Sequence, residues 1–177
     1  MKLYHGTYLD ELVKIIKDGK LDNTKVNEST SEFDAIFEEI TGENFTKNAL
    51  YFSDDIECVV SGYDFEFVVD TEGSFIDTKY LFVADFEKRE EIMCATTDEE
   101  KRMRVQEYKD SFIPYDEYEK CWVSYDKKHT LREFLYFNTV DISLDIEENK
   151  EEILEVFEDN WSYPQDYKVL LGDFCCK

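Results

Sequence analysis

Residues 2–7, Lys2-Leu3-Tyr4-His5-Gly6-Thr7, are the stretch on which the expected fold of this chain depends. They predict a short β-strand that ends in a histidine, a glycine and a hydroxyl. The chain has only two histidines, and one of them lies here. A ligand can approach this strand end closely because Gly6 adds no side chain. The simpler alternative is a turn histidine whose ring is bonded to the backbone.

A second strand is predicted at residues 49–53, and it carries Tyr51. A short helical turn follows, and Tyr63 comes twelve positions after Tyr51. Two tyrosines on either side of a short helix can hold a flat ring between them, since offset stacking adds about 0.5–1.5 kcal/mol beyond burial. The chain has 12 tyrosines, so an ordinary core role for either ring is the alternative.

Glu133 lies in a third predicted strand, residues 131–138, whose side chains alternate between two faces. Leu131, Glu133, Leu135 and Phe137 share one face. A carboxylate in line with three apolar side chains is costly to bury unless it has a partner. Carboxylates in such settings are candidates for function. An edge position or a salt bridge is the alternative, because 36% of the residues are charged.

His5, Tyr51 and Glu133, in this order and in these settings, resemble the His-Tyr-Glu triad of one family of enzymes. The family is the ADP-ribosyltransferases of the diphtheria-toxin and poly(ADP-ribose) polymerase type. The resemblance implies that NAD is the substrate and that no metal is needed. It covers three stretches and one further core strand, namely residues 1–19, 49–63, 131–143 and 80–85.

The resemblance also implies how NAD is bound. In the family, the histidine hydrogen-bonds the adenosine ribose, and the backbone of the next residue holds the nicotinamide amide. Gly6 and Thr7 match that pattern. A pair of tyrosines clamps the nicotinamide, a role that falls here to Tyr51 and Tyr63.

Glu133 corresponds to the family's catalytic glutamate. Its carboxylate would bond the 2′-hydroxyl of the ribose and stabilise the positive charge that builds up as the bond to nicotinamide breaks. Members that modify arginine have a Glu or Gln two residues before this glutamate. Leu131 stands there in this chain, which argues against arginine as the acceptor.

The loop before Glu133, residues 125–130, falls where the family reads its acceptor, and it carries Lys127, Lys128 and His129. The chain has 43 acidic and 20 basic side chains, a net charge of −23. Such a charge favours basic partners and repels phosphate backbones and anionic membranes. We therefore expect a basic protein acceptor rather than a nucleic acid, unless the lysines form a local positive patch. A merely solubilising surface is the alternative.

Three functions are compatible with these residues. The first is a mono-ADP-ribosyltransferase that modifies a protein. The second is an NAD glycohydrolase that uses the same pocket with water as the acceptor, and product analysis separates it from the first. The third is a non-enzymatic acidic binding protein that masks a basic partner, which would bind that partner but not NAD.

The five cysteines and two histidines have no zinc-binding spacing. An odd cysteine count with an adjacent Cys175-Cys176 pair is typical of reduced thiols in a cytosol. No leader precedes His5, and no apolar run approaches the roughly 18 residues of a membrane helix. We expect a cytoplasmic protein that binds neither metal nor membrane.

The expected fold is a single α+β domain over residues 1–177, similar to an ADP-ribosyltransferase domain, with a strand-rich core and flanking helices. Helices are predicted from Thr7 or Tyr8 to residue 18, with Thr7 as the candidate N-cap and Gly19 as the C-cap, at 32–40 ended by Gly42, at 98–109 and at 147–157. Strands are predicted at residues 2–7, 49–53, 65–70, 74–77, 80–86, 121–125, 131–138 and 167–171.

Overall fold

The computed structural model of the chain describes residues 1–24, 32–42, 45–73, 76–129, 131–160 and 164–175. Its class is mixed α+β, as predicted, with 53% helix and 21% strand. In chain order the elements are β1 (Lys2–Thr7), α1 (Leu9–Asp18), β2 (Lys20–Leu21), α2 (Glu32–Thr41), β3 (Leu50–Phe52), α3 (Ile56–Val60), β4 (Phe65–Asp70), η1 (Thr78–Tyr80), β5 (Leu81–Asp85), α4 (Phe86–Cys94), α5 (Asp98–Lys109), β6 (Ile113–Pro114), α6 (Tyr115–Asp126), β7 (Arg132–Tyr136), β8 (Val140–Asp141), α7 (Ser143–Glu148), α8 (Lys150–Asn160), α9 (Pro164–Leu171) and η2 (Gly172–Cys175).

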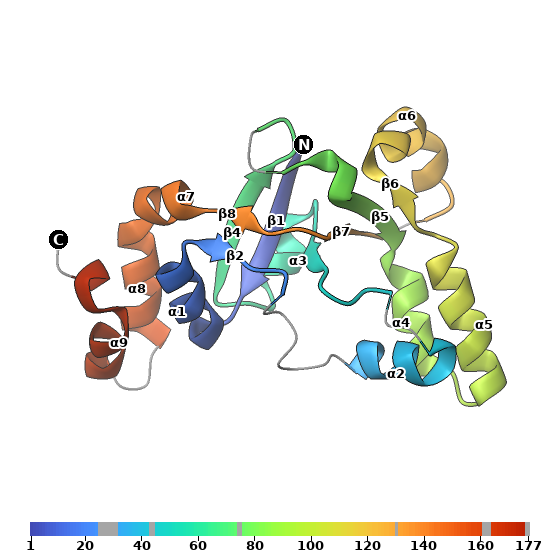
Figure 1. The fold of residues 1–177 in the computed structure, drawn as a ribbon, viewed down its shortest axis with the longest axis horizontal. Coiled ribbons are helices and arrows are strands. Elements are labelled where there is room, and N and C mark those ends of the chain that lie inside the picture. The colour runs from blue at the N-terminus through green and yellow to red at the C-terminus, as the bar shows by residue number, and fades with distance from the viewer. Residues whose placement is uncertain (25–31, 43–44, 74–75, 130, 161–163, 176–177) are drawn as a thin grey trace.

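The strands of the described part form three small antiparallel sheets in the middle of the molecule (Figure 1). β1 pairs with β4, β2 pairs with β8, and the largest sheet has the order β3-β7-β5-β6. Two backbone hydrogen bonds between Tyr4 and Ser53, of 2.8 and 2.9 Å, connect β1 to the end of β3. The strand that carries His5 is thereby fixed beside the strand that carries Tyr51.

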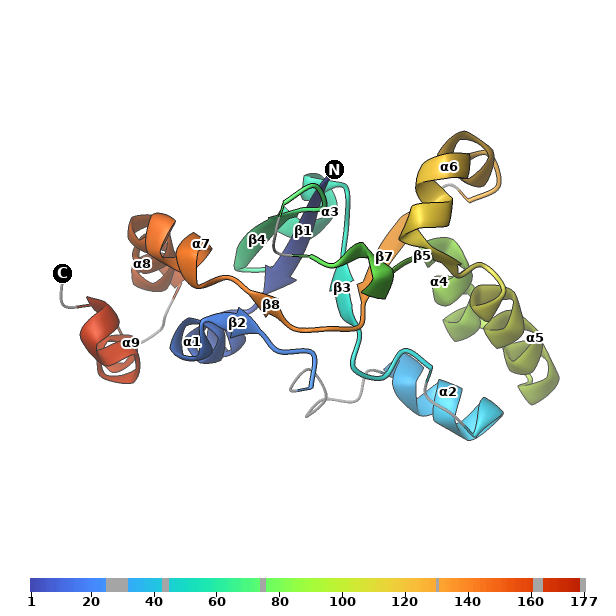
Figure 2. The same ribbon diagram turned by 45° about the horizontal axis from the view of Figure 1, so that its top comes forward.

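Apart from the short helix α3, which lies beside the strands in the middle, the α-helices lie in two groups at opposite ends of the long axis (Figures 1 and 2). α1, α7, α8 and α9 lie at one end, while α2, α4, α5 and α6 lie at the other. The core consists of two apolar clusters. The larger one includes Leu3, Phe52 and Phe134 and extends to the buried tyrosines of α6, and the smaller one joins Ala84 and Leu135 of the sheet to α2, α4 and α5. The two faces of β7 therefore belong to different clusters.

Two segments predicted as strands are helical. Residues 121–125 belong to α6, where Tyr115, Tyr118 and Tyr125 are buried at helical spacing while Trp122 and Val123 are exposed. The run of aromatic and β-branched residues that indicated a strand is therefore mostly the outer face of a helix. Residues 167–171 belong to α9, which begins with proline at its first position, a place that proline favours.

Smaller boundary predictions also need correction. Thr7 ends β1 instead of capping α1, whose N-cap is Tyr8 without a side-chain hydrogen bond. The late helix at residues 147–157 is two helices, α7 and α8, which meet at Asn149. Of the strand predicted at residues 74–77, the first two residues lie outside the described part and the last two form no strand. Helix outweighs strand over the chain, so the strand-rich description fits only its middle.

Candidate functional site

His5 lies in β1, and the backbone of Tyr51 holds its ring. The distance from His5 Nδ1 to the Tyr51 carbonyl oxygen is 2.9 Å. Because a carbonyl oxygen only accepts, Nδ1 carries the proton, and Nε2 is the acceptor of the neutral ring. Burial lowers the pKa of His5 although this hydrogen bond acts in the opposite direction. The ring is therefore neutral at pH 7 and can accept a hydrogen bond from a hydroxyl through Nε2.

The sheet register places Tyr51 and Glu133 on one face of two neighbouring strands. Tyr51 in β3 pairs with Leu135 in β7. Because successive side chains alternate, Glu133 projects on the same side as Leu135. Leu135, and Ala84 of β5, which pairs with Glu133, belong to the apolar cluster that includes residues of α4 and α5. The prediction that Glu133 lies on an apolar strand face is confirmed at Leu135, whereas Leu131, predicted on the same face, precedes β7 and is exposed.

Glu133 has two partners, one for each oxygen of its carboxylate. Arg89 Nη1 in α4 donates to Oε2 at 2.6 Å, and the Tyr108 hydroxyl in α5 donates to Oε1 at 2.7 Å. The side chain of Glu133 is only 6% exposed. Burial raises the pKa of Glu133, while Arg89 and Tyr108 act in the opposite direction. Burial also raises the pKa of Tyr108 well above its ordinary value, so this hydroxyl remains a donor.

Arg89 joins two of the predicted site residues, and the sequence argument missed it. Its guanidinium carbon lies 5.1 Å from the centre of the Tyr51 ring and 4.9 Å from the centre of the Phe86 ring. Both distances are within the range of a cation–π interaction. A signal for α4 was available in Asp85, a typical N-cap residue before a run of helix-forming residues. Arg89 itself has no local signal, because its partner Glu133 is 44 positions away.

Asp85 fixes the start of α4 and also holds His129. One carboxylate oxygen accepts from the backbone N–H groups of Glu87 and Lys88, at 3.0 and 3.4 Å. The other lies 2.6 Å from Nδ1 of His129. Because Arg89 follows Asp85 by one turn, this cap also sets the position from which the guanidinium reaches Glu133.

Gly6 and Tyr63 are in direct contact. A Cβ at position 6 would lie 2.2 Å from Cδ2 of Tyr63, so only glycine fits beneath this ring. The ring of Tyr63 also packs against that of Tyr8, with 5.1 Å between the centres, and Tyr63 is 44% exposed. The structure therefore brings His5, Gly6, Tyr51 and Tyr63 together, because β1 runs beside β3 and α3 follows β3.

Thr7 and the predicted acceptor loop are placed differently from the other predicted residues. The Thr7 side chain is fully buried, and its hydroxyl lies 3.5 Å from a carboxylate oxygen of Glu11 in α1. Lys127 and Lys128 follow α6 and are exposed. His129 is instead held inward, against Asp85 and the ring of Tyr125, whose centre is 4.3 Å away. Thr130 lies outside the described residues.

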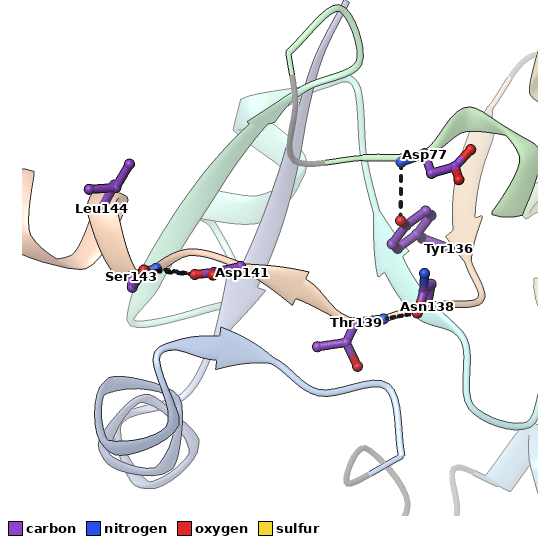
Figure 3. A pocket seen from close by; sticks show the side chains of 7 residues that line it. All are labelled: Asp77, Tyr136, Asn138, Thr139, Asp141, Ser143 and Leu144. Carbon is purple, nitrogen blue, oxygen red and sulfur yellow. Dashed lines mark hydrogen bonds between the residues drawn. The ribbon is translucent and has the colours of Figure 1, made fainter.

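A hollow of about 400 Å³ lies at another place, where β7 leads into β8 and α7 (Figure 3). None of the predicted site residues lines it. Two of the seven lining residues are acidic and none is basic, which makes this hollow a poor site for an anionic dinucleotide. The lining residues are Asp77, Tyr136, Asn138, Thr139, Asp141, Ser143 and Leu144.

The described part of the chain has no group of three or more His, Cys, Asp or Glu side chains able to hold a metal ion. Among the same residues, no helix is long and apolar enough to cross a membrane. Comparisons of the chain with protein-family models, with curated proteins and with solved structures find no match.

The group formed by His5, Tyr51, Arg89 and Glu133 combines three chemical properties. Nε2 of His5 is an acceptor for a hydroxyl, the ring of Tyr51 offers a face for stacking, and the carboxylate of Glu133 can stabilise positive charge. The guanidinium of Arg89 already meets the last two groups in this conformation. The arrangement can therefore offer a hydrogen-bond acceptor, an aromatic face and a negative charge to a ligand.

Proposed function

We propose that the chain is a mono-ADP-ribosyltransferase that moves ADP-ribose from NAD to a protein acceptor. One observation carries the proposal: the register of β3 and β7 directs Tyr51 and Glu133 to the same side, and His5 is bonded to the backbone of that tyrosine. These two relationships between residues far apart in the sequence support the proposal. We propose, on this basis, that the α+β domain is of the ADP-ribosyltransferase type.

The proposed reaction breaks the bond between C1′ of the ribose and the nicotinamide nitrogen, and nicotinamide leaves with the bonding electrons. Positive charge then develops on the ribose. Glu133, bonded to the 2′-hydroxyl, would stabilise this charge, which is fully developed only near the transition state. An acceptor nucleophile bonds to C1′ and loses its proton to solvent. Tyr51 would hold the nicotinamide by stacking, and His5 would accept a hydrogen bond from a ribose hydroxyl.

Charge and thiol chemistry support the proposed acceptor and compartment. A net charge of −23 favours capture of a basic protein. Cys94 and Cys121 are free thiols, which supports a reducing compartment such as the cytosol. Water as the acceptor would make the chain an NAD glycohydrolase, and free ADP-ribose as the main product would identify that activity.

The test is to incubate the protein with a cell lysate and NAD labelled in its adenylate part. We expect the label to appear on protein with the parent chain, and to fall by about 10²-fold or more with Glu133→Gln, which keeps the shape and removes the charge. Glu155→Gln, an exposed position on α8, is the matched control and should label as the parent does. Absence of labelled protein and of free ADP-ribose with the folded parent would contradict the proposal.

A further inference from the structure

The guanidinium of Arg89 occupies a small site made by three other side chains. Tyr51 and Phe86 present their rings to it at 5.1 and 4.9 Å, and Glu133 accepts its N–H at 2.6 Å. Phe86 and Arg89 are three residues apart on α4 and so lie on the same side of that helix. Two aromatic rings and a carboxylate are the groups that recognise a flat organic cation.

Arg89 is the outer of the two partners of Glu133. The Arg89 side chain is 18% exposed, whereas that of Tyr108, on α5, is fully buried. If the Arg89 side chain moved away, Tyr108 would still donate to Oε1 of Glu133. The carboxylate would keep its inner hydrogen bond and lose its counter-charge.

The charges around Glu133 indicate what kind of ligand could replace the Arg89 guanidinium. The titratable groups that act on this carboxylate are Arg89 and Glu90 from α4, Tyr108 from α5 and Asp85 from the end of β5. Arg89 is the cation among these described groups, and Glu90 and Asp85 add negative charge. A ligand that displaced Arg89 would meet an anionic, aromatic-walled site, so it would be selected for positive charge.

We propose that Tyr51, Phe86 and Glu133 form a binding site for a planar organic cation, and that Arg89 is its internal occupant until such a ligand displaces it. The oxidised nicotinamide ring is such a cation. The identity of this ligand as the nicotinamide end of NAD rests on the proposed function, whereas the site itself does not. If both proposals hold, the Arg89 side chain competes with NAD for this site. Without a ligand, the guanidinium of Arg89 fills the site.

The probe that tests this site is the 1-methylnicotinamide cation, with neutral nicotinamide as the uncharged comparison. Binding is measured by calorimetry to the full-length parent and to Arg89→Ala. We expect Arg89→Ala to bind the cation at least about tenfold more tightly than the parent, because the internal competitor is gone. Neutral nicotinamide should show a smaller gain. Adding Glu133→Gln to Arg89→Ala should abolish the preference for the cation.

Arg104→Ala is the matched control, since Arg104 pairs with Glu91 and Glu107 and not with Glu133. It should bind the cation no better than the parent. If Arg89→Ala fails to fold, Arg89→Met keeps the apolar stem and should show the same gain. Equal or weaker cation binding by a folded Arg89→Ala or Arg89→Met, as judged by circular dichroism, overturns the proposal.

Parallel measurements with NAD separate this inference from the proposed function. Tighter cation binding by the Arg89 variants, without NAD cleavage by any form of the protein, supports the site and counts against the transferase. NAD cleavage by the parent, with no gain in cation binding by the variants, supports the transferase and overturns the internal occupant.

Discussion

The ring of Tyr63 packs directly on Gly6, with Val59 beside it. A Cβ at position 6 would lie 2.2 Å from Tyr63 Cδ2 and 2.8 Å from Val59 Cγ1. The glycine after His5 is therefore required by the close approach of a side chain from the segment after α3. This contact ties the second predicted tyrosine of the nicotinamide clamp to the strand that carries His5.

Gly6→Ala should force the Tyr63 ring out of its place. We expect the free energy of unfolding to fall by about 1–3 kcal/mol, as for other overpacked positions. Urea unfolding measures this loss. The same substitution in a Tyr63→Ala background should cost clearly less, because the nearest clash is gone. Equal losses in both backgrounds would show that Tyr63 does not restrict position 6.

Asp85→Ala should destabilise the start of α4. It removes the cap of two backbone N–H groups and the partner of His129, so we expect a loss of about 1–2 kcal/mol in the free energy of unfolding. Asp85→Asn keeps an N-cap acceptor and should cost less. Thr97→Ala, which removes the cap of α5, is the comparison for an exposed cap without a histidine partner. Asp85→Ala and Asp85→Asn with the same stability would contradict a capping role.

Much of the architecture could be predicted from local patterns. The bounds of β4 and α5 agree with the predicted ranges 65–70 and 98–109, and Gly19 ends α1 with a positive φ of 68°. Alternation in one strand was enough to place Glu133 on an apolar face. In each of these cases the signal lies within a few neighbouring residues. Only the resemblance to the His-Tyr-Glu triad suggested that His5, Tyr51 and Glu133 belong to one site.

The contacts of the candidate site that were not predicted join residues that are distant in the sequence. Arg89 and Glu133 are 44 positions apart, as are Asp85 and His129, and no local pattern indicates either pair. The segment around Arg89 has charges on all sides, so one buried arginine does not stand out. Because its partner Asp85 is so distant in the sequence, His129 was assigned to the acceptor-reading loop, although Asp85 holds it inward.

The pH dependence of nicotinamide release should show an acid limb above pH 4.5. Glu133 must be ionised to act, and burial raises its pKa from the ordinary value of 4.5. Activity is therefore present above this raised pKa and is lost as the pH falls through it. His5 also titrates in the site, with its pKa lowered from 6.5 by burial. His5→Gln removes that group, and the acid limb should persist; its disappearance would assign the limb to His5.

Lys127 and Lys128 should affect the acceptor and not the dinucleotide. Both are exposed after α6, so replacing both with alanine should change transfer to the acceptor while NAD hydrolysis stays as in the parent. Transfer by the parent should also slow above about 0.15 M salt, where the screening length is near 8 Å. Equal loss of transfer and hydrolysis in the double variant would show that this segment shapes the NAD site. A labelled product that resists protease but yields to nuclease would make the acceptor a nucleic acid.

The most direct test of the account is the rate at which the purified protein releases nicotinamide from NAD, with the basic acceptor fraction of a lysate present. We predict measurable release by the parent at saturating NAD, and release slower by about 10²-fold or more by folded Glu133→Gln under the same conditions. Release by Glu133→Gln at the parent rate, or no release by the folded parent, would contradict the assignment of Glu133 to the chemistry.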